Sequence, residues 1–185
     1  PFLAAGRAMG FDRFELSHDV PPAALADPEL TAVAIPTVHH PCPTTDARTA
    51  GGLVADDDDV RARAVAALRE TVATAARLGA TVVVLHLGRV PDDDEETARR
   101  LLFELTNRFL AGQRGTERYE AARTRLAAWV AEREPRPLAH GIASLRAVAA
   151  EAGDRGIRLA IETGYHPHEL PTPTVLATLL DALVR

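Results

Sequence analysis

The sequence predicts an α/β fold with a parallel β-sheet, and three observations support this prediction. Four short apolar segments have the composition of buried strands, amphipathic segments of helical period lie between them, and the two kinds alternate along the chain. The 185 residues are 46% hydrophobic and 25% charged, which is normal for a globular domain. Because only 4% are aromatic, the core has to be built from Ala, Val, Leu and Ile.

The predicted strands have apolar centres without polar alternation. They span residues 11–18, 31–39, 80–87 and 157–163. The third is the clearest, because four consecutive β-branched residues are followed by Leu85. Such a continuous apolar run is typical of a strand that is covered on both faces.

The predicted helices fill the intervals between the strands. They span residues 60–78, 92–110, 116–132, 138–152 and 174–185, and residues 2–9 have the pattern of the end of another helix. An apolar stripe at helical spacing marks the first of these, and Gly79 is its expected C-cap. The acidic residues 56–59 precede it, where negative charge suits a helix N-terminus. We therefore interpret them as a cap and a solvated loop rather than as a metal-binding loop.

Three predicted helices between the third and fourth strands indicate an insertion that could act as a lid. The acidic run DDDEE opens the first of them, residues 133–137 are expected to be a loop, and Gly153 or Gly156 ends the third. Thr172 and Pro173 are expected to cap the final helix. Helical patterns run at both ends of the sequence without caps, so residues 1–185 are interpreted as one incomplete domain, truncated at both ends.

Charge and cysteine content narrow the function classes. The formal net charge of −5 disfavours nucleic acid as the main partner. The single cysteine, Cys42, cannot form an internal disulfide, which fits a cytoplasmic location. No stretch has the roughly 20 apolar residues that a membrane span requires, so no membrane partner is expected.

Every predicted strand finishes with a carboxylate, an imidazole or both. The polar residues at or just after these ends are Glu15, His18, His39, His40, His86, Glu162, His166, His168 and Glu169. Because the carboxyl ends of parallel strands meet at one edge of a sheet, these side chains indicate a shared polar site.

Glu162 is the strongest candidate. It follows an apolar strand core, and burying a carboxylate there is costly unless it is paired, hydrogen-bonded or metal-bound. A structural Glu paired with Arg is the alternative. His86 also ends an apolar strand, and Gly88 after it allows close backbone approach. His39 and His40 point opposite ways in an extended chain, and we assign His39 to the site because the following proline turns the chain away after His40.

The remaining candidates have a weaker basis. Glu15 could equally be a solvated carboxylate at the rim, and His166 and His168 could belong to a polar loop rather than a substrate pocket. Neither a phosphate-binding glycine loop nor a GxSxG elbow is present. Cys42 lies between prolines near His40, but no sequence feature indicates the lowered thiol pKa that a nucleophile needs.

Three segments resemble the xylose isomerase-like (β/α)-barrels, a family that includes sugar-phosphate isomerases and epimerases and abasic-site endonucleases of the endonuclease-four type. The segments are GFDRFELSH, which resembles the family's second strand, VVVLHLGRV, which resembles the fourth, and RGIRLAIETGYHPHELPTP, which resembles the fifth strand and its loop. The resemblance implies a partial (β/α)8 TIM barrel that covers roughly strands 2 to 5, with a helical insertion before strand 5.

The resemblance also implies a divalent metal ion (Mn, Mg, Co or Zn) at the barrel mouth. Glu162 matches the family's first carboxylate ligand, and the other isomerase ligands would come from strands beyond Arg185. In the nuclease branch, His39 or His40 and His86 would also be zinc ligands. Many relatives have Asn where this chain has Thr163, which leaves the hydrogen bonding that orients Glu162 open.

The function implied by the resemblance is a metal-dependent sugar or sugar-phosphate isomerase or epimerase that transfers a proton next to a carbonyl. Glu162 and His86 would be catalytic, with Glu162 as the metal ligand. The expected substrate-binding residues are His39, His168, Glu15 and His166. The full-length protein could be a homo-oligomer. The alternatives are an endonuclease-four-like metallo-phosphodiesterase that acts on abasic DNA and a non-catalytic fragment, and we expect this chain alone to be inactive.

Overall fold

The computed structural model describes residues 2–44, 51–91 and 96–184. Its main sheet is parallel, with the strand order β1-β2-β3-β5. The strands are Arg13–Leu16 (β1), Ala34–His39 (β2), Val82–Leu85 (β3) and Arg158–Ile161 (β5). The predicted parallel sheet is confirmed, and each strand is shorter than its predicted segment.

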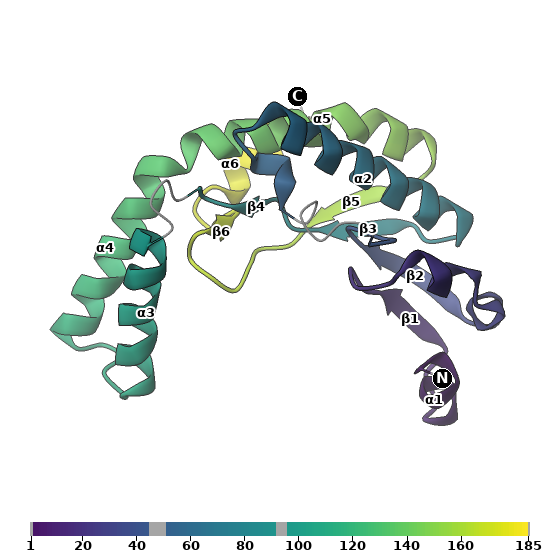
Figure 1. The fold of residues 1–185 in the computed structure, drawn as a ribbon, viewed down its shortest axis with the longest axis horizontal. Coiled ribbons are helices and arrows are strands. Elements are labelled where there is room, and N and C mark those ends of the chain that lie inside the picture. Colours follow the sequence, from purple (N-terminus) through teal and green to yellow (C-terminus); the bar gives the residue numbers. More distant parts are fainter. Residues whose placement is uncertain (1, 45–50, 92–95, 185) are drawn as a thin grey trace.

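Helices separate the strands along the chain (Figure 1). The α-helices are Phe2–Ala8 (α1), Asp58–Arg77 (α2), Glu96–Leu110 (α3), Glu117–Arg133 (α4), Pro135–Asp154 (α5) and Leu176–Val184 (α6). Short 3-10 helices are formed by Pro22–Ala26 (η1), Pro28–Ala32 (η2) and Gly52–Val54 (η4). Among the described residues, every helix is too short or too polar to cross a membrane.

The N-terminus of α2 confirms the interpretation of its acidic residues as a cap. The Asp57 carboxylate accepts hydrogen bonds from the amides of Asp59 and Val60 at 2.8 and 3.0 Å. These backbone hydrogen bonds lower the pKa of Asp57. Asp56 lies outside the helix and pairs with Arg136 of α5 at 2.9 Å. The acidic segment therefore caps the start of α2 and pairs with a residue of α5.

Two predicted boundaries are wrong. Residues 133–137 do not form a loop, because α5 begins at Pro135 and Glu134 alone separates it from α4. Proline suits the first turn of a helix, where its missing N–H would have no partner. The final helix begins at Leu176, and Thr172 donates its hydroxyl to Glu134 at 3.2 Å instead of capping that helix. Residues 92–95 of the predicted acidic helix start lie outside the described residues.

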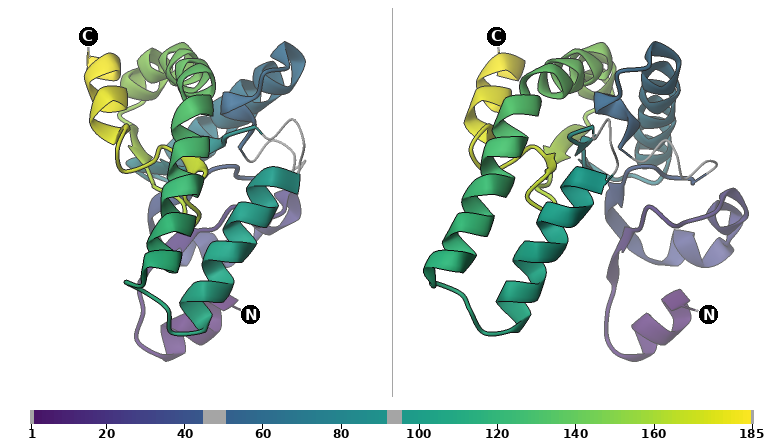
Figure 2. Two further views of the ribbon diagram at one scale, coloured as in Figure 1. Left: turned by 90° about the vertical axis from the view of Figure 1, so that its left-hand side faces the viewer. Right: turned by 60° about the vertical axis from the view of Figure 1, so that its left-hand side comes forward.

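The insertion before β5 consists of α3 and α4, which form an antiparallel pair that projects from the sheet (Figure 2). Glu104 of α3 joins the two helices by accepting hydrogen bonds from Arg125 of α4 at 2.7 Å. The third predicted helix of the insertion, α5, instead packs beside α2 over the sheet (Figure 1). The insertion is thus smaller than predicted, and its role as a lid stays a prediction.

The two faces of the main sheet differ in burial. Leu16, Val38, Val83 and Leu85 are buried and share one face by their register, and on this side α2 packs against β2 and β3 while α5 packs against β5. The opposite face carries Glu15, Thr37, Val82, Val84, Arg158 and Ala160, all partly or fully exposed. The prediction that the third strand is covered on both faces is therefore wrong for the described residues, which place their helices on one face only.

A small antiparallel sheet of Gly88–Arg89 (β4) and Glu169–Leu170 (β6) was not predicted. It ties the segment that follows His86 to the segment that follows Glu162. The Val90 amide extends this connection by donating to the His168 carbonyl at 2.8 Å. Strands of two residues are too short to show a periodic pattern, so the sequence carries no signal for them.

Candidate metal centre

His39, His86 and Glu162 meet at the carboxyl edge of the main sheet, at or just after the ends of β2, β3 and β5. Nε2 of His39 lies 3.5 Å from a Glu162 carboxylate oxygen, and Nε2 of His86 lies 3.8 Å from the same oxygen. One ligand atom from each residue lies within 4.8 Å of the other two. The structure thus brings together three of the predicted site residues, with ligand atoms close enough together that they could hold one metal ion.

Backbone carbonyls hold both imidazoles with Nε2 toward Glu162. Nδ1 of His39 lies 3.0 Å from the His40 carbonyl oxygen, and Nδ1 of His86 lies 3.2 Å from the Glu162 carbonyl oxygen. A carbonyl oxygen only accepts, so each Nδ1 carries the hydrogen and each neutral ring has its lone pair on Nε2. This is the form in which histidine binds a metal ion, with the other ring nitrogen anchored.

Glu162 is less buried than predicted. Its side chain is 50% exposed, because the described residues do not cover the inner face of the sheet at this point. Its carboxylate faces the Nε2 atoms of His39 and His86, and within the described part of the chain no arginine pairs with it. The alternative of a structural Glu paired with Arg therefore has no support in this geometry.

Two further strand-end residues lie beside the cluster rather than in it. The ring of His18, which follows β1, lies 5.2 Å from that of His39, and the His86 ring lies at the same distance on the other side. Glu15 points to the inner face and accepts a hydrogen bond from Thr37 at 2.7 Å. Thr37 precedes His39 by two residues, so Glu15 lies one layer deeper along the strands. Its role in substrate binding stays a prediction.

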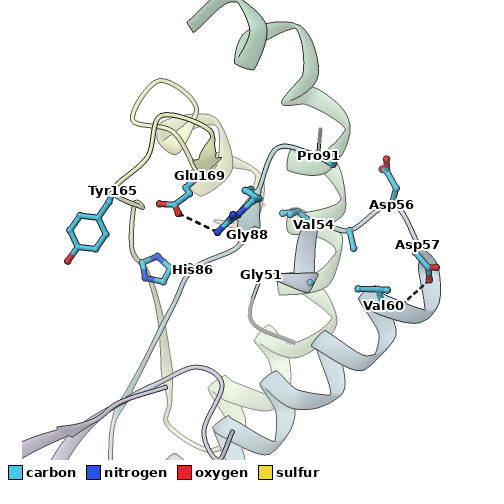
Figure 3. Close-up of a pocket in the computed structure, with 13 residues that line it drawn as sticks. Gly51, Val54, Asp56, Asp57, Val60, His86, Gly88, Pro91, Tyr165 and Glu169 are labelled. Atoms are coloured by element: carbon cyan, nitrogen blue, oxygen red, sulfur yellow. Dashed lines mark hydrogen bonds and ion pairs between the residues drawn. The ribbon is translucent and has the colours of Figure 1, made fainter. Parts of the chain in front are cut away.

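His166 and His168 lie in the loop after Glu162, outside the cluster. Their rings stack at 5.7 Å, and both border a cavity of about 630 Å³ that also contacts α3. A neighbouring cavity of about 610 Å³ reaches from His86 to Asp57 at the start of α2 (Figure 3). Arg89 and Glu169, paired at 3.9 Å, line both cavities. The substrate-binding roles of the two histidines also stay predictions.

His40 and Cys42 are buried on the other side of β2, behind the cluster. Burial, followed by the adjacent His39, lowers the pKa of His40 to about 4. Burial raises the pKa of the Cys42 thiol to about 11. The thiol is therefore protonated near neutral pH, which agrees with the expectation that Cys42 is not a nucleophile.

We expect the burial of His40 to make the protein less stable in mild acid. The pKa of His40 is lower in the folded protein than the ordinary 6.5, so the unfolded chain binds more protons between pH 6.5 and about 4. The contribution is complete above pH 6.5 and is lost as the pH falls, by about 2 kcal/mol between pH 7 and 5. Urea unfolding at both pH values measures it. His40→Asn keeps a donor near the Nδ1 position but cannot titrate, so an unchanged pH dependence in this variant would contradict the assignment.

Comparison with known proteins identifies the fold. Residues 3–117 match the family model described as xylose isomerase-like TIM barrel. Among solved structures, L-ribulose 3-epimerase matches with a TM-score of 0.61 and 20% identity over 99% of this chain and 50% of that one. D-psicose 3-epimerase matches with a TM-score of 0.56 and 18% identity over 99% and 53%.

A xylose isomerase domain protein from Planctomyces limnophilus also matches, with a TM-score of 0.54 and 14% identity over 99% of this chain and 54% of that one. No curated protein matches the sequence significantly. The chain spans about half the length of these solved structures. The predicted fold, a partial (β/α)8 barrel, is confirmed by these matches.

Proposed function

The chain belongs to the xylose isomerase-like TIM-barrel family, and on this premise we propose that it carries part of the active site of a metal-dependent sugar isomerase or epimerase. The observation that supports the proposal most is the convergence of two Nε2 lone pairs and one carboxylate at the carboxyl edge of the sheet. The names of the matched structures, L-ribulose 3-epimerase and D-psicose 3-epimerase, support sugars as the substrate class.

The three residues fit a divalent metal ion. Two imidazoles and a carboxylate suit Zn²⁺, Mn²⁺ or Co²⁺, and three protein ligands leave coordination positions open for a substrate, as catalytic sites require. The sequence assigned Glu162 to the metal in both branches of the family, and His39 or His40 and His86 in the nuclease branch. The proposal takes His39 and His86 as ligands together with Glu162, because their ligand atoms lie within 4.8 Å of one another. When bound, such an ion acts as a Lewis acid on a carbonyl oxygen.

The residues around the cluster have separate tasks in this proposal. Glu162 holds the ion, and the carbonyl-anchored rings keep Nε2 of His39 and His86 directed at the same point. The cavity beside His86 receives the sugar (Figure 3). His86, which the sequence predicted to be catalytic, would act in this proposal as a ligand of the ion, because its only free lone pair is the one directed at Glu162.

The second candidate function is a metallo-phosphodiesterase that acts on abasic DNA. One observation favours it: His39 and His86 lie together with Glu162, and these are the histidines that the nuclease branch would use as zinc ligands. The net charge of −5 opposes it, because binding to the phosphate backbone relies on Lys and Arg.

Metal titration combined with two activity assays tests the proposed function. We expect this chain to bind one Mn²⁺, Co²⁺ or Zn²⁺ ion by calorimetry. The protein that contains it should interconvert ketohexose epimers in the presence of that ion, with no incision of a duplex that contains an abasic site. Incision together with binding of more than one ion would favour the nuclease. If neither activity occurred in the metal-loaded protein, the non-catalytic alternative would hold.

A further inference from the structure

We propose that Thr71 and His40 are positioning residues that orient His39 for metal binding, so this inference rests on the proposed function. Thr71 lies on α2 and is fully buried, and residue His40 is 3% exposed. Neither residue belongs to the metal cluster. They act on it through the His40 carbonyl oxygen, which accepts the Nδ1 hydrogen of His39 at 3.0 Å.

The hydroxyl of Thr71 contacts three groups. Its oxygen lies 3.0 Å from the Ala67 carbonyl oxygen, 2.9 Å from the Cys42 amide nitrogen and 3.1 Å from Nδ1 of His40. A hydroxyl offers one hydrogen and two lone pairs. All three contacts are hydrogen bonds only when Thr71 donates to Ala67 and accepts from both Cys42 and His40.

This arrangement assigns the hydrogen of the neutral His40 ring to Nδ1. The other ring nitrogen, Nε2, is buried without a hydrogen-bond partner among the described residues. In the opposite tautomer, Nε2 would carry a buried N–H without an acceptor, and the Thr71 hydroxyl would lose one of its three bonds. Buried N–H groups without partners are rarer than buried acceptors without partners, which also favours hydrogen on Nδ1.

Thr71 thereby fixes the direction of the His40 carbonyl. The His40 ring and the Cys42 amide both donate to the same hydroxyl, and the His40 amide donates to the Val84 carbonyl at 2.8 Å. The backbone of residues 40–42 is thus held from α2 on one side and from β3 on the other. A carbonyl held in this way sets the ring plane of His39 and directs its Nε2 at Glu162.

Packing alone does not require a hydroxyl at position 71. The buried neighbours on the same side of α2 include Leu68, Val72 and Ala75, which are apolar. Valine would fill nearly the same volume as Thr71 but could neither accept from His40 and Cys42 nor donate to Ala67. The hydroxyl is therefore better explained by the hydrogen bonds that it makes to the segment behind the metal cluster.

A pair of variants separates the hydroxyl from the shape of the side chain. We expect Thr71→Val to weaken Co²⁺ or Zn²⁺ binding by about 10-fold. This is the lower end of the effect of losing an outer hydrogen bond to a metal ligand, because Thr71 acts on His39 only through the His40 carbonyl. Thr71→Ser keeps the hydroxyl and should bind within about threefold of the unaltered protein. Thr74→Val, at another buried position of α2, is the control for a buried Thr-to-Val change. Equal affinity in Thr71→Val and the unaltered protein, or equal loss in Thr71→Ser and Thr71→Val, would overturn the proposal.

Nitrogen NMR tests, without metal, the hydrogen-bond chain that leads from Thr71 through His40 to His39. Two-bond ¹⁵N–¹H correlations should show hydrogen on Nδ1 of His39 and His40 in the unaltered protein and in Thr71→Ser, and mixed tautomers of His40, with a changed His39 signal, in Thr71→Val. If the unaltered protein bound no divalent metal, the proposed function would fail. The spectra would still show whether Thr71 orients His40 and His39. Identical spectra in Thr71→Val and the unaltered protein would show that Thr71 does not position His40 and His39, even if metal bound as proposed.

Discussion

Replacing Glu162 with Gln is expected to weaken divalent-metal binding by more than about 100-fold and to abolish the proposed turnover. Within the described residues, Glu162 supplies the only carboxylate of the cluster, 3.5 and 3.8 Å from the two Nε2 atoms. The amide keeps the size of the side chain but removes the negative charge that a divalent ion needs. Even outer hydrogen-bonding partners of metal ligands are worth 10- to 100-fold in affinity, so a ligand itself should be worth more.

Titration of Zn²⁺ or Co²⁺ into the variant and the unaltered protein measures this effect directly. Glu151→Gln is a matched control, because Glu151 lies on α5, where it pairs with Arg69 and Arg155 away from the cluster. We expect this control to bind metal normally. If Glu162→Gln bound the ion as tightly as the control, Glu162 would not be a ligand and the proposed metal centre would be wrong.

The position of this cluster could be predicted from the sequence because the strands are parallel and closely in register. Val84 aligns with His39 on one side and with Ala160 on the other. Two residues further along, His86 and Glu162 therefore leave their strands on the same face and at nearly the same height. A strand-by-strand list of terminal residues was sufficient to find this pair and to prefer His39 over His40.

The contacts behind the cluster could not be predicted in this way. Thr71 and His40 are 31 residues apart in sequence, and a threonine within an apolar helical stripe looks like an ordinary core residue. The same holds for β4 and β6, whose two-residue strands pair across the site without any periodic signal. The exposure of Glu162 was misjudged for another reason, since a strand pattern cannot show whether anything covers the inner face of the sheet.

Gly88→Ala is expected to destabilise the protein by about 3 kcal/mol or more, because backbone strain and steric overlap add at this position. The φ angle of Gly88 is +132°, a region that residues with a side chain rarely adopt. A β-carbon would lie 2.1 Å from the Gly51 carbonyl oxygen and 2.7 Å from a methyl carbon of Val54. The first neighbour is backbone, so the overlap can be relieved only by moving the chain beside the start of α2.

Gly112→Ala separates the two contributions. Gly112 also has a positive φ, +70°, but a β-carbon there would meet nothing within 4 Å, so only conformational strain of about 1 to 2 kcal/mol is expected. Urea unfolding of both variants gives the difference. Because Gly88 pairs with Leu170 in the small sheet and follows His86 by two residues, the shift should also reach the cluster and weaken metal binding. Equal destabilisation by the two substitutions would mean that the backbone at Gly51 moves away from the added β-carbon at little cost. The close approach of the Gly51 and Gly88 backbones would then not constrain the site.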